Sequence, residues 1–157
     1  MGTNLGISIG TRTMGMAVLR DGALVDWRIK TFWKKWSTDK LEAIITVIHK
    51  QISRFEITSI TLKKPVGSHC SGNIQRIVDR IQALSRERHI KLRECTIRDL
   101  KQRYTSDYRA NKGILISALA VRYPELSTAY SKERSNRNPY HAKLFEAIEC
   151  ALTETGQ

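Results

Sequence analysis

Residues 27–36, WRIKTFWKKW, combine aromatic rings with cationic side chains and could bind nucleic acid. They contain all three tryptophans of the chain and four basic residues. Aromatic rings among cations are suited to stacking on unpaired bases, because every base offers a π face. The alternative is that the rings belong to the core, with Trp27 on the apolar face of a strand and Phe32 or Trp36 against the next helix. Trp33 is the ring that we most expect to be exposed.

Ser8 is a polar residue in the middle of an apolar run, LGISIGT. In many proteins that begin with such a run and a glycine turn, the middle position carries an acid that handles a metal or a phosphate. A serine hydroxyl is a poor ligand by itself for a hard cation, which prefers anionic oxygen. The opening therefore resembles that of an enzyme from which one chemical group is missing.

The charge of the chain favours a polyanionic partner. Of 157 residues, 27 are Lys or Arg and 15 are Asp or Glu, which gives a net charge of +12 and a pI near 10.0. Such an excess attracts polyanions over long range. No apolar run approaches the roughly 20 residues that span a bilayer, so no membrane partner is expected. Nucleic acid is the first partner to consider, and a basic surface that serves only solubility is the alternative.

The cysteines do not suggest a metal site. Cys70, Cys95 and Cys150 are odd in number, far apart and outside any CxxC or Cys/His pattern. We interpret them as reduced packing residues of a cytoplasmic protein, without zinc.

The apolar pattern predicts strands and helices in alternation. Asp21-Gly22 is typical of a tight turn between strands. Ser37 and Ser71 can cap helices whose apolar residues recur at three- and four-residue steps. The expected strands are residues 4–10, 14–20, 23–31, 57–62 and 90–95; further helices are expected at 97–104, 111–123 and 140–153. Residues 125–139 are polar and are expected to be irregular.

Three strands in succession, followed by alternating helices and strands, indicate an α/β fold. We predict a five-stranded mixed sheet, an antiparallel meander plus parallel strands, flanked by helices on both faces. This is the order of the ribonuclease H-like fold, in a single domain that spans residues 1–157.

Segments of the chain match one nuclease family in order and spacing. They are residues 5–12 (LGISIGTR), 55–65 (FEITSITLKKP) and 140–153 (YHAKLFEAIECALT), together with Asn111-Lys112-Gly113 at the start of the penultimate helix. Through them the chain resembles the RuvC-type Holliday-junction resolvases over nearly its whole length. The resemblance implies a DNA partner. It also implies a homodimer, because resolvases are dimers and residues 71–89 fall in the corresponding region.

Members of that family hold two divalent metal ions with four carboxylates and cut phosphodiesters with metal-activated water. The resemblance places the four acids at Ser8, Lys63, Lys143 and Glu146, so a single acid is present. An ammonium about 4 Å from a divalent ion is repelled by about 8 kcal/mol at an effective dielectric of about 20. The resemblance therefore implies a degenerate site with no catalytic residue, no bound metal and no cofactor.

Lysines can also bind phosphates directly, so DNA binding without cleavage is our leading interpretation. The residues expected to contact DNA are Arg12, Lys63, Lys64, Lys112, Lys143 and, by stacking, Trp33. Resolvases carry a lysine near the start of the penultimate helix, which favours Lys112. They often place an aromatic residue after the fourth strand to open the junction, where this chain has Val66.

Two alternatives remain open. Glu146 and Glu149 lie three residues apart on one expected helix and could form a rearranged nuclease site around Mg²⁺ or Mn²⁺, with His141 or Asp26. The other alternative is a non-enzymatic protein-interaction or regulatory subunit of a DNA-processing complex.

Overall fold

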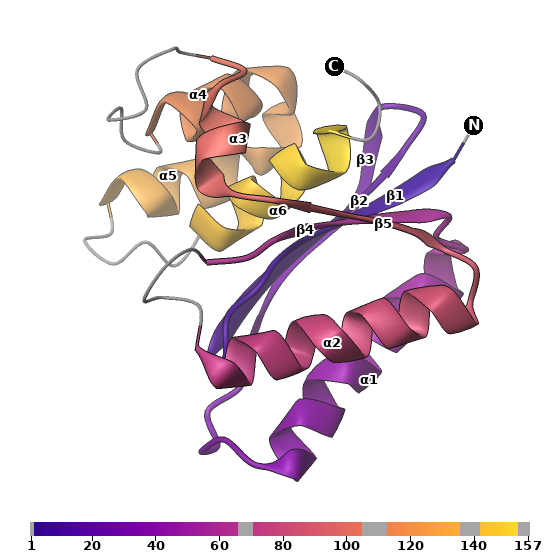
Figure 1. Cartoon of the computed structure of the whole chain (residues 1–157). Coiled ribbons are helices and arrows are strands. Elements are labelled where there is room, and N and C mark those ends of the chain that lie inside the picture. Colours follow the sequence, from indigo (N-terminus) through magenta and orange to yellow (C-terminus); the bar gives the residue numbers. More distant parts are fainter. Residues whose placement is uncertain (1, 66–70, 105–112, 136–141, 154–157) are drawn as a thin grey trace.

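The protein is built on one mixed five-stranded sheet (Figure 1). The computed structural model describes residues 2–65, 71–104, 113–135 and 142–153. The strand order is β3-β2-β1-β4-β5, with β1 antiparallel to β2 and parallel to β4. The strands are β1 (Thr3–Ser8), β2 (Thr13–Arg20), β3 (Ala23–Thr31), β4 (Ser59–Lys63) and β5 (Lys91–Cys95). The predicted meander with added parallel strands is confirmed.

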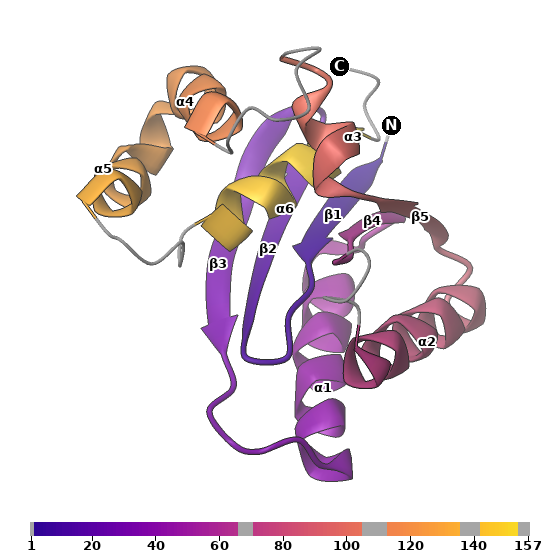
Figure 2. The ribbon, with the colours of Figure 1, turned by 60° about the vertical axis from the view of Figure 1, so that its left-hand side comes forward.

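Helices cover both faces of the sheet (Figures 1 and 2). The helices α1 (Thr38–Phe55) and α2 (Gly72–Glu87) lie on one face, and α6 (Ala142–Thr153) crosses the other. Outside α6 lie α3 (Ile97–Lys101), α4 (Gly113–Arg122), a 3-10 turn (Pro124–Leu126) and α5 (Ser127–Ser135). The alternation in β1 produces this layering, because Leu5 and Ile7 belong to the core beneath α1 and α2, whereas Gly6 and Ser8 face α6.

The first two helices begin where the sequence predicts. The Ser37 hydroxyl accepts a hydrogen bond from the Lys40 amide at the start of α1, and the Ser71 hydroxyl accepts one from the Ile74 amide at the start of α2. Each bond satisfies an amide that lacks an intrahelical partner. The predicted apolar stripe of α1 is buried at Ile44, Ile45, Ile48 and Ile52.

Two glycines allow α6 to lie directly on the sheet. A Cβ atom on Gly6 would be 1.8 Å from the Ala147 carbonyl oxygen, and one on Gly15 would be 2.1 Å from the Lys143 carbonyl oxygen. Both distances are far shorter than a van der Waals contact, so any side chain at these positions would push the helix away from the sheet. This close approach places Lys143 and the residues that follow it over the ends of β1 and β4.

Two expectations about local structure were wrong. Residues 125–139 were expected to be irregular, but the 3-10 turn and α5 occupy much of that segment. Leu126 is fully buried and Tyr130 packs against the core beside α6. Tertiary contacts therefore stabilise helical structure that the weak apolar pattern of this segment does not predict. The alternative that placed Trp27 on a buried face was also wrong, since Trp27 is 37% exposed on β3, an edge strand.

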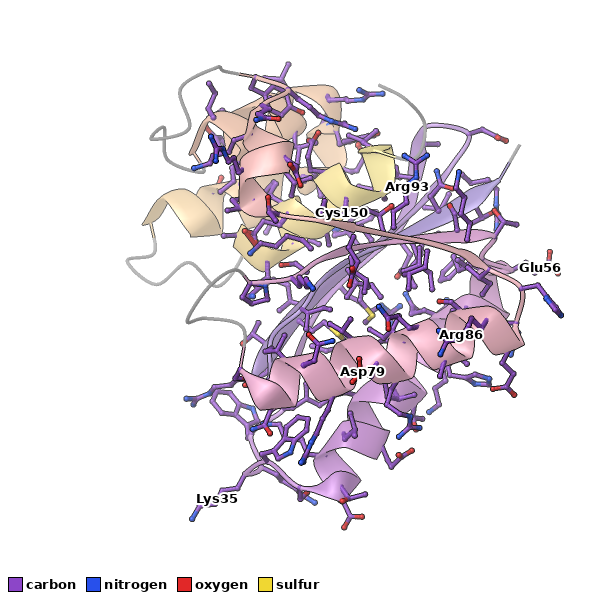
Figure 3. All side chains as sticks on the ribbon, viewed as in Figure 1. Lys35, Glu56, Asp79, Arg86, Arg93 and Cys150 are labelled. Carbon is purple, nitrogen blue, oxygen red and sulfur yellow. The ribbon has the colours of Figure 1, made fainter. Side chains whose placement is uncertain are left out.

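Cys95 and Cys150 are both buried and reduced, and their Sγ atoms lie 3.4 Å apart. Cys150 lies on α6 (Figure 3), and burial raises the pKa of its thiol well above the usual range. These two residues are packing residues, as predicted, while Cys70 lies outside the described residues. None of the described helices is long and apolar enough to cross a membrane.

Candidate functional site

The ends of β1 and β4 bring Ser8 and Lys63 side by side. The two residues are partners in the parallel ladder, and the Ile9 amide donates a 3.0 Å hydrogen bond to the Lys63 carbonyl oxygen. The side chains of both residues reach a residue of α6, so they lie on the same face of the sheet. In open α/β sheets, ligands commonly bind at the carboxyl ends of the strands, which is where this pair lies.

Glu146 of α6 joins the two strand ends. Ser8 Oγ donates a 2.9 Å hydrogen bond to Glu146 Oε1, and Lys63 Nζ lies 3.3 Å from Oε1 and 3.2 Å from Oε2. The side chain of Glu146 is 1% exposed and that of Lys63 is 8% exposed. A buried carboxylate requires such partners, since little water reaches it. The ammonium and the hydroxyl therefore offset the charge of Glu146 inside the protein.

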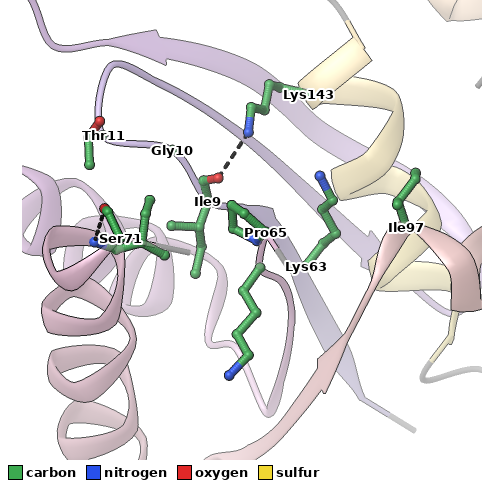
Figure 4. A pocket seen from close by; sticks show the side chains of 10 residues that line it. Ile9, Gly10, Thr11, Lys63, Pro65, Ser71, Ile97 and Lys143 are labelled. Carbon is green, nitrogen blue, oxygen red and sulfur yellow. Dashed lines mark hydrogen bonds between the residues drawn. The ribbon is translucent and has the colours of Figure 1, made fainter. Parts of the chain in front are cut away.

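Lys143 lies three residues before Glu146 on α6, and its Nζ donates a 2.9 Å hydrogen bond to the Ile9 carbonyl oxygen (Figure 4). The strand ends thus gather, in one place, all the positions that the family resemblance assigned to metal-binding acids: Ser8, Lys63, Lys143 and Glu146.

A pocket of about 490 Å³ opens beside these residues. Lys63, Lys64 and Lys143 line it, together with Thr11, Ser71 and Ile97 among others (Figure 4). We call it the lysine pocket. Lys64 Nζ lies 3.8 Å from Glu94 Oε1, and both side chains are about one-third exposed. Water therefore screens this ion pair, and the attraction between the two charges is weak. The pocket therefore presents cationic groups at the edge of the sheet.

Two divalent metal ions do not fit this arrangement. Glu146 is the only acid among the four positions, and its carboxylate already bonds to a hydroxyl and an ammonium. The Lys63 ammonium lies beside this carboxylate, so it would repel a cation that approached Glu146. Among the residues that the structure describes, no group of three or more His, Cys, Asp or Glu could hold a metal ion.

Glu149 has a separate set of partners. Its buried carboxylate accepts 2.7 Å hydrogen bonds from Arg103 Nη1 and from the Tyr104 hydroxyl. Burial raises the pKa of Glu149 despite these bonds, which act in the opposite direction. Its carboxylate thus fastens the segment after α3 to α6 rather than pairing with Glu146.

Asp26, the other acid considered for a rearranged site, lies on the opposite side of the sheet. It bonds to Arg28 at 3.0 Å and to Gln51 Nε2 of α1 at 2.9 Å, whereas Glu146 is on α6. His141 lies outside the described residues. In the part of the chain that the structure describes, neither acid proposed for the rearranged nuclease site approaches Glu146 as a ligand partner.

Arg12 and Trp33 form a second feature at the same end of the sheet. The guanidinium carbon of Arg12 lies 4.5 Å from the centroid of the Trp33 ring, and Trp33 is 74% exposed. Phe32 and Trp36 pack against the core, so the expectation that Trp33 is the exposed ring is confirmed. Arg12 does not line the lysine pocket, although its neighbour Thr11 does. Lys112 and Val66 lie outside the described residues.

Some features of the site had a sequence signal and others did not. A serine inside an apolar run marked Ser8 as a site position, and the structure shows that its hydroxyl bonds to Glu146. By contrast, no local pattern marked Arg103 and Tyr104 as the partners of Glu149, since they come from a different element.

Solved structures resemble this chain over nearly its whole length, although no family model and no curated protein matches the sequence. Thermus thermophilus RuvC aligns with a TM-score of 0.72 and 14% identity, covering 98% of this chain and 93% of that one. The yeast mitochondrial Holliday junction resolvase Ydc2 gives 0.64 and 10%, covering 94% and 75%. The Fowlpox virus resolvase, solved with substrate Holliday junction DNA, gives 0.59 and 12%, covering 98% and 97%.

The chain has the RuvC fold. The resemblance expected from the sequence is thus confirmed in the fold, and so is the ribonuclease H-like architecture. At these identities the likeness to RuvC concerns the fold, and the chemistry of the site follows from its own residues. In this version of the RuvC fold, the strand ends hold a buried Lys63–Glu146 pair beside the lysine pocket.

Proposed function

We propose that this RuvC-like domain binds DNA, four-way junctions included, through contacts to backbone phosphates and does not cut it. The observation that supports the proposal is the Lys63–Glu146 pair. It places an ammonium 3.2 Å from the single acid at the family's metal positions. The same strand ends then offer cations to a phosphate rather than carboxylates to a metal.

Lys64 and Lys143 are the main phosphate contacts in this proposal. Lys63 lines the pocket too, but Glu146 offsets its charge, so it contributes less. Ser71 and Ile74, at the start of α2, also line the pocket, where the helix dipole adds partial positive charge. Arg12 and Lys112 are proposed as further contacts to the DNA backbone, and the net charge of +12 draws DNA toward the protein.

The test is the salt dependence of binding to a duplex and to a four-way junction, measured by fluorescence anisotropy. About six phosphate contacts give a log–log slope near −5. Lys64→Gln and Lys143→Gln are each expected to reduce the magnitude of this log–log slope by about 0.9. Each should also weaken binding to all DNA sequences by the same factor. Lys50→Gln, on an exposed position of α1, is the matched control and should leave the slope unchanged.

Other outcomes distinguish the alternatives. A flat salt response would contradict DNA binding and favour an interaction or regulatory subunit. Cleavage of junction DNA in Mg²⁺ or Mn²⁺ that Glu146→Gln abolishes, at a temperature where its melting curve shows the variant folded, would contradict the non-catalytic role and favour a rearranged nuclease. The expected result is intact junction DNA with either ion.

A homodimer is also part of this proposal, on the strength of the family resemblance. Light scattering on the purified protein should give twice the chain mass of 18.0 kDa. A mass of one chain, both free and with junction DNA, would contradict it.

A further inference from the structure

A second pocket, of about 340 Å³, lies between Trp33 and the first turns of α1. We call it the Trp33 pocket. Its lining combines two aromatic rings and an alanine with charged groups: Phe32, Trp33, Lys34, Asp39, Lys40 and Ala43. Phe32 packs against the core behind the pocket, while Trp33 forms an exposed wall. Its volume is at the lower end of the range for small-molecule sites, so it admits one flat group rather than a base pair.

Buried and backbone contacts hold the pocket in shape. Lys40 is 8% exposed, and its Nζ donates a 2.8 Å hydrogen bond to the Lys34 carbonyl oxygen. The Phe32 amide donates a 2.7 Å hydrogen bond to the Arg12 carbonyl oxygen, and the Arg12 guanidinium stacks on the Trp33 ring. Because the segment is already ordered, a ligand would lose little affinity to arranging it. An exposed tryptophan fixed in this way is a surface prepared for stacking.

The polar groups at the pocket suit a nucleobase. The Asp39 side chain provides carboxylate oxygens, which accept hydrogen bonds from the amino group of a base. Lys34 lines the pocket, and Lys35 projects outward from the same connection (Figure 3), so both place cations near the phosphates on either side of such a base. Stacking on an aromatic ring tolerates different bases, whereas the carboxylate favours those that carry an amino group.

We infer that the Trp33 pocket binds one unpaired, amino-bearing base of the DNA strand whose phosphates occupy the lysine pocket. This inference rests on the proposed DNA binding and adds a site that recognises an unpaired base of single-stranded DNA. The two pockets adjoin the same turn, because Thr11 lines the lysine pocket and Arg12 covers Trp33. A strand can therefore place a phosphate on one side of the turn and a neighbouring base on the other.

The test uses the full chain and oligonucleotides that carry 2-aminopurine, a fluorescent amino-bearing base, at successive positions of a single-stranded gap. Stacking on Trp33 is expected to quench the probe at one or two positions. Trp33→Ala should remove the quenching and weaken binding to gapped DNA by roughly tenfold, with no change for a fully paired duplex. Trp33→Phe should restore most of both effects, because the ring remains.

Two further variants complete the design. Trp27→Ala removes another partly exposed tryptophan, on the edge strand, and should leave the quenching unchanged. Asp39→Ala should reduce the preference of the protein for a gap of cytosine or adenine over one of thymine, since the side-chain acceptor is lost. Melting curves of each variant show whether it is folded.

The outcomes separate this inference from the proposed function. If duplex and gapped DNA bind with a steep salt response but no position is quenched, the base pocket is wrong and phosphate binding stands. If Trp33→Ala weakens both DNAs equally, the base pocket is also wrong. If neither DNA binds at low salt, both proposals fail.

Discussion

Lys63 Nζ lies 3.2 Å from Glu146 Oε2, and the two side chains are buried between the ends of the strands and α6. Each of them alone would be an uncompensated charge in the interior. Together with the Ser8 hydroxyl they form a buried polar cluster in which each charge offsets the other. The ends of β1 and β4 are thereby filled by polar side chains of the protein itself.

The pair predicts strong coupling between its two members. Lys63→Met and Glu146→Gln should each lower the free energy of unfolding by about 3–5 kcal/mol, because each leaves a buried group without its counter-charge. The double variant Lys63→Met/Glu146→Gln should cost clearly less than the sum. Ser8→Ala is the control within the same unit and should cost about 1 kcal/mol, the value of one hydrogen bond. Urea unfolding measures all four proteins, and additive effects would contradict the pairing.

The sequence predicted the positions of Ser8 and Lys63 better than their roles. Apolar periodicity placed Ser8 inside the first expected strand and Lys63 directly after the expected strand 57–62, since a side chain's face follows from its place in the strand. The resemblance to the resolvases implied that the two positions lie together, and they are partners in the parallel ladder. Periodicity does not show that Lys63 would turn inward to Glu146, because that contact joins segments 83 residues apart.

The same limit applies to the parts that sequence reasoning missed. The residues of α5 make contacts with α4 and with the core that outweigh their weak local preference for a helix. The shape of the Trp33 pocket likewise depends on the hydrogen bond from Lys40 to the Lys34 carbonyl oxygen. No sequence motif predicts this bond. Trp33 itself was identified because its type and neighbours already suggested stacking.

Restoring the missing acids should restore metal binding. The triple variant Ser8→Asp/Lys63→Glu/Lys143→Asp places four carboxylates together with Glu146, and their mutual repulsion should lower the melting temperature without metal. Mn²⁺ should raise the melting temperature again. At a concentration 100 times its dissociation constant, the ion should add about 2.7 kcal/mol to the free energy of unfolding. Differential scanning calorimetry measures the shift.

The wild-type protein should show no such stabilisation. Lys35→Glu/Lys50→Glu, two exposed charge reversals elsewhere, reproduces four of the five charge units that the triple variant changes and should also fail to respond. A triple variant that folds but is not stabilised by Mn²⁺ would contradict the assignment of these four positions.

The contact between α6 and the sheet predicts that Gly6 tolerates no side chain. Gly6→Ala would place a methyl group 1.8 Å from the Ala147 carbonyl oxygen, and a helix backbone cannot move locally to avoid it. We expect a loss of about 3 kcal/mol or more in the free energy of unfolding. Gly72→Ala is the matched control, since its Cβ meets no atom within 4 Å, and it should be close to neutral. Equal effects of the two variants would contradict this packing.

Asp26 predicts a pH dependence of stability. Burial acts to raise the pKa of this carboxyl, but hydrogen bonds from Arg28 and Gln51 outweigh it, and the net pKa is lowered. A lowered pKa in the folded state means that the ionised form stabilises the fold above the unfolded value of about 3.9. That contribution is lost as the pH falls through the folded pKa.

Asp26→Asn should therefore cost about 1 kcal/mol near neutral pH, and the difference from wild type should vanish in acid. Urea unfolding between pH 2 and pH 7 measures it. Asp79→Asn, on an exposed position of α2, provides the control and should run parallel to wild type throughout. Because Asp26 lies on the face opposite α6, its removal should leave the affinity for DNA unchanged. A variant of normal stability that loses DNA binding would instead place Asp26 in the functional site.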